Sequence, residues 1–332
     1  MKPFRLSIAL ALMLGIIHFQ ASAQVTYIGQ FKVTVYSQTD PTPPTDPVSY
    51  YFGVTLNSDP AFAISLPMVF TPSQTTDGEF IMNENGPQDF GFGSPSYPDK
   101  TDFDNDYPNG DYDYFVDWPC TNGNIMSEDL YIDLPQNDLY SSTIPAFSAD
   151  TYQAFQQVDP SQDVLISWAP YVAEPGADLA HTFIGTYDNQ TYNSAYGGFN
   201  FDCDTDQTSV IMPGGSLDYG RSYTMNLYYS NRLQPDDVDN SDGTGVFVII
   251  GFDDLTQITI TTIPATLQIG VTNQCATLSW PAAATNYKLQ STCDLSTGIW
   301  NDVTNNPNIV GSFNQVMVSA KKSAAFFKLT SL

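Results

Sequence analysis

The chain has 332 residues, with 10 Lys and Arg against 36 Asp and Glu, and a formal charge of −26. This charge excludes a nucleic-acid-binding protein that works by neutralising phosphates. Hydrophobic residues make up 42% of the chain and aromatic residues 14%, which is enough to build hydrophobic cores in two or three domains and favours β-rich extracellular modules.

The amino terminus has the pattern of a secretory signal peptide. Lys2 and Arg5 precede an apolar run over residues 6–17, and Ala21-Ser22-Ala23 supplies the small residues of a cleavage site. An uncleaved membrane anchor is the alternative, but roughly 20 apolar residues are needed to span a bilayer. We therefore expect a signal peptide over 1–23 and a secreted or cell-surface protein that does not span the membrane.

The charge is unevenly distributed along the rest of the chain. Residues 24–265 carry four basic and 34 acidic residues, a formal charge of −30, whereas residues 266–332 carry four Lys and two Asp. This change of sign predicts a module boundary near Pro264, and a linker from Pro135 to Pro145 predicts a second division. The expected domains are an N-terminal β-sandwich over 24–134, a second over 135–265 and a short module over 266–332.

Short runs of β-branched and aromatic residues between Pro, Gly, Asn and Asp predict strands throughout residues 24–265. Helical periodicity is scarce. The expected fold class is therefore all-β, with tandem antiparallel β-sandwich domains. The predicted strands are 30–36, 49–56, 61–70, 111–117, 163–168, 181–187, 207–212, 222–229 and 245–262.

The second group of strands carries a specific resemblance. In Leu217-Asp218-Tyr219-Gly220-Arg221-Ser222-Tyr223, a Leu stands six positions before a Tyr with a Gly between them. This resembles the tyrosine corner of fibronectin type III and immunoglobulin-like domains. The resemblance implies that the Tyr223 hydroxyl bonds back to the backbone of the corner while its ring fills the core. Trp168, at the end of an apolar strand, is similar to the buried early-strand tryptophan of the same family.

The last module repeats part of this pattern in 276–281 (ATLSWP), 286–291 (NYKLQS) and 325–329 (AFFKL). It is similar to the short fibronectin-like module that ends many secreted multi-domain proteins of Verrucomicrobia-type bacteria. The resemblance covers roughly residues 100–332 and speaks for fold more than for function. It implies that the module serves attachment or sorting.

Four cysteines in an exported chain predict two disulfides. A hairpin turning through residues 282–285 would bring Cys275 opposite Cys293, and in a fibronectin sandwich the same bridge would instead join opposite sheets. Either arrangement predicts Cys275–Cys293, which leaves Cys120–Cys203.

Patterns of catalytic residues are scarce. After the signal peptide the chain has a single histidine, His181, so a catalytic triad has one possible base and a zinc site too few His ligands. We interpret His181 as a plain strand residue. No Gly-rich phosphate loop, HExxH or GxSxG is present. Glycosidases need two carboxyl groups about 5 to 9.5 Å apart, and nothing in the sequence selects such a pair among so many Asp.

Two acidic clusters are candidate Ca²⁺ sites, because alternating carboxylates can place oxygen ligands on one side of a turn. Neither is an EF-hand, since the first has Tyr107 where that loop needs Gly and the second ends in no Glu. Solvated acidic loops are the alternative. The candidate ligands are Asp102, Asp104 and Asp106 in the first cluster, and Asp237, Asp239, Ser241 and Asp242 in the second.

These observations predict a non-catalytic, secreted or envelope-associated binding or structural protein, whose partner is an extracellular glycan or a cell-surface component. The alternative is a hydrolase that acts on extracellular glycans with a pair of Asp carboxylates. Apart from possible Ca²⁺, no cofactor is expected. We expect a deep acidic cleft lined by aromatic residues in the hydrolase, and convex sandwiches with Asp confined to loops in the binding protein.

Overall fold

The computed structural model describes residues 25–59, 69–72, 80–119, 125–189, 197–235, 238–239, 245–319 and 325–332. Within these residues the chain is built from strands, with two short α-helices, so the predicted all-β class is confirmed. None of the described helices is long and apolar enough to cross a membrane. The predicted signal peptide over 1–23 lies outside the described residues.

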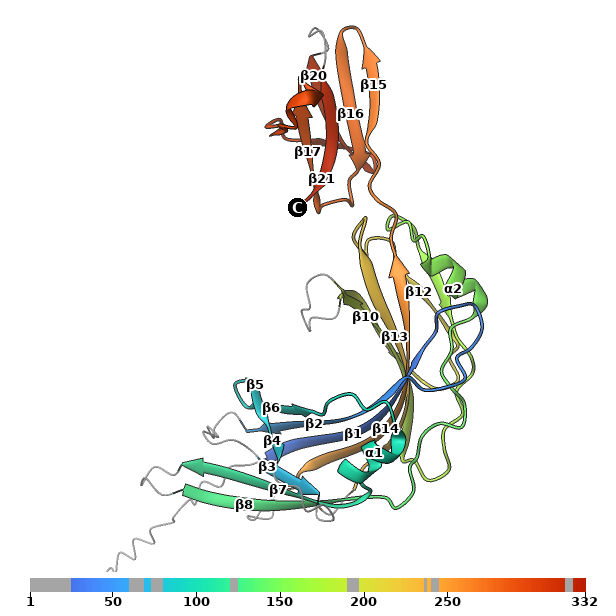
Figure 1. Cartoon of the computed structure of the whole chain (residues 1–332), viewed down its shortest axis with the longest axis vertical. Coiled ribbons are helices and arrows are strands. Elements are labelled where there is room, and N and C mark those ends of the chain that lie inside the picture. Colours follow the sequence, from blue (N-terminus) through green and yellow to red (C-terminus); the bar gives the residue numbers. More distant parts are fainter. Residues whose placement is uncertain are drawn as a thin grey trace, which may run out of the picture.

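The elements of residues 25–261 are shown in Figure 1. They are β1 (Val25–Ser37), β2 (Ser49–Ser58), β3 (Val69–Pro72), β4 (Phe80–Ile81), β5 (Asn83–Gly86), β6 (Asp89–Gly93), α1 (Lys100–Asp106), β7 (Gly110–Pro119), β8 (Ile125–Leu134), α2 (Ala149–Phe155), β9 (Val164–Ser167), β10 (Leu179–Asp188), β11 (Gly197–Cys203), β12 (Ser209–Met212), β13 (Ser222–Leu233) and β14 (Phe247–Thr261).

A single eight-stranded sheet, here called the central sheet, organises this part of the molecule. Its order is β11-β10-β13-β14-β1-β2-β6-β5. Neighbouring strands are antiparallel except β1 and β14, which run parallel with Tyr27 opposite Phe247. The ranges expected to form two domains, 24–134 and 135–265, therefore contribute strands to one sheet, and the boundary after residue 134 does not separate two sheets.

Two hydrophobic cores lie against one face of the central sheet. Alternation along β2 buries Phe52, Val54 and Leu56, which pack with Tyr112 and other residues of β7 and β8. Further along the sheet, Leu227 and its neighbours pack with residues of α2, β9 and β12. The molecule is thus a pair of sandwiches that share the central sheet, with the sheet β4-β3-β7-β8 covering one half and the pair β12-β9 with α2 covering the other.

A buried polar seam separates the two cores. On β14, Asp254 and Thr256 lie between Phe252 of the first core and Ile258 of the second. The segment between β8 and α2 crosses the sheet here. Its backbone N–H at Ser141 donates to Asp254 Oδ2 at 2.7 Å, and its carbonyl at Pro145 accepts from Thr256 Oγ1 at 2.6 Å. Hydrogen bonds therefore replace apolar contacts where the chain passes from one sandwich to the next.

The last module has its own two sheets. Their orders are β15-β16-β20-β19 and β18-β17-β21, the first of which matches the A-B-E-D order of immunoglobulin-type sandwiches. The elements are β15 (Gln268–Thr272), β16 (Cys275–Pro281), β17 (Tyr287–Thr292), the short 3₁₀ helix η1 (Leu295–Thr297), β18 (Asn301–Asp302), β19 (Asn308–Val310), β20 (Phe313–Ser319) and β21 (Phe326–Ser331).

The predicted pairing of Cys275 with Cys293 is wrong. β16 pairs with β15 and β20, whereas β17 pairs with β18 and β21, so the hairpin does not form and the two strands lie in opposite sheets. The bridge between opposite sheets is absent too, because both cysteines are free. Of the cysteines that the structure describes, Cys203, Cys275 and Cys293 are all free thiols. Cys120, the proposed partner of Cys203, lies outside the described residues.

The module contacts the rest of the chain, residues 25–265 and here called the body, through the turn between β12 and β13. Tyr219 is buried in the core of the module, together with Leu278 and Trp280. Its carbonyl accepts a hydrogen bond from Asn286 Nδ2 at 3.0 Å, and its hydroxyl donates to Asp159 at 3.1 Å. Tyr219 thus contacts both parts of the chain.

Candidate functional site

The face of the central sheet opposite the two cores carries a groove. The sheet bends between β10–β13 and β1–β2, and α2, β12 and the β7–β8 pair lie on the outer side of this bend (Figure 1). On the inner face Val33, Val35 and Leu255 are buried beneath half-exposed aromatic rings. The rings are those of Phe31, Tyr51 and Tyr228.

A cavity of about 560 Å³ lies at the aromatic end of this face and is formed by residues of β1, β2, β6, β10, β11, β13 and β14. Such a mixture of aromatic surface with a few polar groups is typical of ligand sites. Its aromatic lining consists of Phe31, Tyr51, Phe92, Phe183, Tyr187 and Tyr228, and its polar lining includes His181, Asp202, Ser230, Arg232 and Asp253.

Glycines on the same face let two of these rings lie against the backbone. Phe31 stands opposite Gly251 in the register of β1 and β14, and a Cβ at Gly251 would come within 2.3 Å of Cδ1 of the Phe31 ring. A Cβ at Gly29 would come within 2.8 Å of the same ring, and one at Gly185 within 2.9 Å of Phe183 Cε1. The rings therefore cover glycine backbone, where any larger residue would displace them.

A hydrogen-bonded polar group lies beside the Phe31 ring. Arg232 Nε donates to Ser230 Oγ at 3.0 Å, and the Ser230 hydroxyl donates to Asp253 Oδ1. The Arg232 guanidinium carbon is 5.9 Å from the centre of the Phe31 ring, within the range of a cation–π contact. Burial raises the pKa of Asp253 to about 6, although the Ser230 hydrogen bond and the Arg232 charge both act to lower it.

His181 lies in β10, as predicted, and belongs to this cavity. Its Nδ1 is 2.9 Å from Asp202 Oδ1. Burial, with the nearby Arg232 charge, lowers the pKa of His181 despite the opposing effect of Asp202. The imidazole is therefore neutral at pH 7 and donates its Nδ1 proton to the carboxylate. Ser230 donates its hydroxyl to Asp253 and not to His181, so these residues do not form a Ser-His-Asp relay.

The groove continues from this cavity along β14 to the edge of the sheet where β1 ends, and there it meets α2 from the outer side. A second cavity of about 430 Å³ shares Tyr51, Tyr187 and Tyr228 with the first and adds Thr224 and Gln257.

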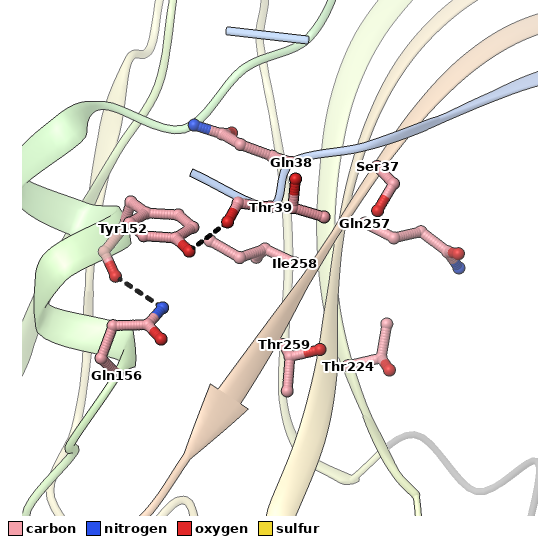
Figure 2. Close-up of a pocket in the computed structure, with 9 residues that line it drawn as sticks. All are labelled: Ser37, Gln38, Thr39, Tyr152, Gln156, Thr224, Gln257, Ile258 and Thr259. Carbon is pink, nitrogen blue, oxygen red and sulfur yellow. Dashed lines mark hydrogen bonds between the residues drawn. The ribbon is translucent and has the colours of Figure 1, made fainter. Parts of the chain in front are cut away.

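A third cavity, of about 310 Å³, shares Thr224 and Gln257 with the second and reaches α2 (Figure 2). Here the Tyr152 hydroxyl donates to the Thr39 carbonyl at 2.5 Å, and Gln156 Nε2 donates to the Tyr152 carbonyl at 3.2 Å. The lining of this end is dominated by hydroxyl and amide groups.

The first predicted Ca²⁺ cluster lies in a helix and not in a loop. Asp102, Asp104 and Asp106 belong to α1, which begins after the N-cap Asp99. Residues two apart in a helix do not face the same side, so the three carboxylates do not converge. Asp104 accepts from Lys32 Nζ at 3.0 Å and from Lys100 Nζ, and Asp106 accepts from the Tyr97 hydroxyl at 2.6 Å.

Of the second predicted cluster, only Asp239 lies within the described residues, where it forms an isolated β-bridge with Gly245. Asp237, Ser241 and Asp242 lie outside them. In the described part of the chain, no three His, Cys, Asp or Glu side chains are grouped so that they could hold a metal ion. Calcium binding therefore stays a prediction.

Sequence reasoning missed the groove, because its residues come from seven strands and form no local motif. One signal was present. Glycine occurs at 29, 53, 185 and 251, each within a strand, where it is normally unfavourable. Glycine inside a strand indicates a site that another group approaches closely, and at three of these positions that group is an aromatic ring of the chain itself.

Comparison with known proteins does not assign the chain to a family. No family model matches it, and no curated protein is similar to it in sequence.

Three of the similar solved structures are 9 to 12% identical to this chain. A structure concerned with host cell surface retention of a 1.5-MDa bacterial ice-binding adhesin is 12% identical, with 90% of this chain and 88% of that chain covered and a TM-score of 0.21. Domains FN1–FN3 of chicken CNTN1 are 9% identical, with 92% and 88% covered and a TM-score of 0.20. Domains A168–A170 of titin are 11% identical, with 93% and 92% covered and a TM-score of 0.21. These scores are too low to carry an argument about function.

Proposed function

We propose that this chain is a non-catalytic binding protein and that the groove on the inner face of the central sheet holds a glycan. The observation that carries the proposal is the pair of rings, Phe31 and Phe183, laid over glycine backbone within a cavity that also contains hydrogen-bonding groups. A sugar ring has an apolar C–H face and a polar edge of hydroxyls, so it needs a flat apolar surface with donors and acceptors beside it.

The charges of the groove and of the molecule favour a neutral glycan. Within the cavity, Asp202 contacts His181, and Asp253 is bonded to Ser230 near Arg232. Residues 24–265 carry a formal charge of −30, which repels polyanions. A neutral chain escapes this repulsion while its hydroxyls can still bond to carboxyl, guanidinium and imidazole groups.

Binding to neutral polysaccharides tests the proposal. The mature chain, from Gln24 onward, should be screened on a glycan array and then titrated with the polysaccharides that it binds there. We expect Phe31→Ala and Tyr228→Ala to weaken binding about tenfold, or ~1.4 kcal/mol. Tyr131→Ala is the matched control, because Tyr131 lies on β8, is 64% exposed and does not line the groove. Absence of glycan binding, or equal affinities in all three variants, would refute the proposal.

A second variant tests the position of the Phe31 ring without removing its side chain. Gly251→Ala leaves every aromatic residue in place but puts a methyl group where the Phe31 ring lies. The ring must then move off the backbone, so binding should weaken while circular dichroism and the melting transition confirm that the chain is still folded.

A hydrolase is the second candidate, because the aromatic groove contains Asp253. A general acid must hold its proton near neutral pH, and the pKa of Asp253 is raised to about 6. Release of reducing ends from the bound polysaccharide, abolished by Asp253→Asn, would establish catalysis in place of simple binding. Retained binding with no hydrolysis supports the non-catalytic function.

The proposed location is outside the cell, supported by the signal-peptide pattern of residues 1–23. The 266–332 module is proposed to attach the groove-bearing part to a surface. Intact-mass analysis of exported protein should then give a chain that begins at Gln24, and deletion of 266–332 should release the protein from the cell fraction. A full-length mass that retains Met1 would contradict export by this signal.

A further inference from the structure

The three cavities of the groove follow one another along the strands. On β14 their lining runs from Asp253 through Leu255 and Gln257 to Thr259, in steps of two residues. Alternation in a strand places these residues on the inner face, whereas Ile258, which also lines the third cavity, belongs to the second core, so the groove ends at the edge of the sheet. Each cavity shares side chains with the next, Tyr228 among the first pair and Gln257 among the second. The axis of the groove is therefore parallel to β14.

This path is long compared with a single sugar. Asp253 and Thr259 are six residues apart, which corresponds to about 20 Å in a strand. On the neighbouring β13, Arg232 lines the first cavity and Thr224 the second and third, a separation of eight residues or about 27 Å. Only an extended ligand can occupy both ends of the groove at once.

The two ends differ in chemistry. The first cavity has the Phe31 and Phe183 rings with Arg232. At the other end Tyr152 of α2 is the one ring among the described lining residues, its hydroxyl is bonded to the Thr39 carbonyl, and the remaining groups are mainly hydroxyls and amides (Figure 2). One end therefore offers stacking surface and the other offers hydrogen bonds.

We infer that the groove binds a linear glycan chain lying parallel to β14, with one part of the chain stacked on Phe31 and a more distant part hydrogen-bonded near α2. This inference rests on the proposed function and adds the form of the ligand to it. Each end contributes separately to affinity, so a short oligosaccharide occupies the aromatic end alone, whereas a longer one reaches both ends.

Oligosaccharide length tests the inference. The mature chain should be titrated calorimetrically with β-1,4-glucan, β-1,4-mannan, β-1,4-xylan and β-1,3-glucan oligosaccharides from dimer to hexamer. For the series that binds, we expect the affinity to rise at least tenfold from dimer to hexamer. Equal affinity at all lengths would leave the glycan-binding function standing and overturn the extended-chain inference. Failure of every oligosaccharide to bind would overturn both.

Substitutions at the two ends give an independent readout. Gln156 and Thr259 are exposed at the α2 end, so the double variant Gln156→Ala/Thr259→Ala should fold normally. It should bind the hexamer about tenfold more weakly and the dimer as before, whereas Phe31→Ala should weaken the binding of both. Gln136→Ala, an exposed glutamine outside the groove, is the matched control and should change neither. Equal losses for dimer and hexamer in the double variant would contradict the inference.

Discussion

The backbone N–H of Asp218 donates a hydrogen bond to the Tyr223 hydroxyl at 2.8 Å, five residues along the chain. The Tyr223 ring is buried in the second core, where Leu217 is also buried. The corner implied by the Leu217-to-Tyr223 pattern is thus confirmed, as is the burial of Trp168. The bond fixes the turn from which Tyr219 reaches into the last module.

Tyr223→Phe should destabilise the protein by about 1–3 kcal/mol. The variant keeps the ring in the core but leaves the partly buried Asp218 N–H without its acceptor, and an unsatisfied donor carries a penalty of this order. Urea unfolding measures the change, with Tyr131→Phe as an exposed control. A loss below about 0.5 kcal/mol, the usual range of surface substitutions, would show that the bond does not hold the corner.

The stability of the protein should fall as the pH rises from about 4 to about 8, because of Asp254. Burial raises the pKa of this carboxyl to about 8, with the Asp253 charge adding to the increase and the Ser141 N–H opposing it. Over that pH range the unfolded chain has released the Asp254 proton while the folded chain retains it. Raising the pH therefore favours unfolding, and the penalty is complete above about pH 8.

Asp254→Asn removes this titration and keeps an oxygen acceptor for the Ser141 N–H. Compared with the natural chain, the variant should gain stability by on the order of a few kcal/mol between pH 5 and pH 8. Urea unfolding at both pH values measures the difference. Parallel stability curves for the two proteins would mean that Asp254 is ionised in the folded state.

Gly220→Ala should loosen the last module from the body. Gly220 has a positive φ of 67°, and a Cβ there would come within 2.2 Å of the Tyr287 hydroxyl. We expect faster proteolysis near Pro264 and a lower melting temperature for the module. Asn286→Ala, which removes the bond to the Tyr219 carbonyl, should have the same effect to a smaller degree. Unchanged proteolysis in both variants would show that this contact does not join the two parts.

Calcium, if it binds the 237–242 cluster, should raise the melting temperature of the mature chain by several degrees, because a ligand at 100 times its Kd stabilises the native state by ~2.7 kcal/mol. Millimolar CaCl₂ should be compared with NaCl of matched ionic strength, since salt alone relieves repulsion among carboxylates. Asp237→Asn and Asp239→Asn should remove only the calcium-specific part. Equal shifts in both salts, unaffected by the substitutions, would eliminate the site.

Local patterns predicted many of the strands, but not their neighbours in the sheet. Alternation of apolar and polar residues in 30–36 and 49–56 identified parts of β1 and β2, although only β2 buries a single face and β1 is buried on both. The parallel partner of β1 is β14, more than 200 residues away, and no local pattern encodes that pairing.

In two places the local sequence predicted a structure that differs from the one observed. The acidic sequence of α1 indicated a loop, but Asp99 caps the helix by accepting from two backbone N–H groups, and Lys100 neutralises part of its charge. The residues between β16 and β17 allowed a hairpin, but the two strands lie in opposite sheets, which is the arrangement implied by the fibronectin resemblance.

The parallel pairing of β1 with β14 also determines when the body can fold. Tyr27 and Phe247 are neighbours in the sheet but 220 positions apart in the chain (247 minus 27). β1 is the first described strand of the body to be synthesised and β14 is the last, yet the two are neighbours at the centre of the sheet. Long-range pairing of this kind makes folding slow. Under the proposed export, the chain could not complete the central sheet while it crosses the membrane, and it would stay unfolded until nearly all of the body has passed through.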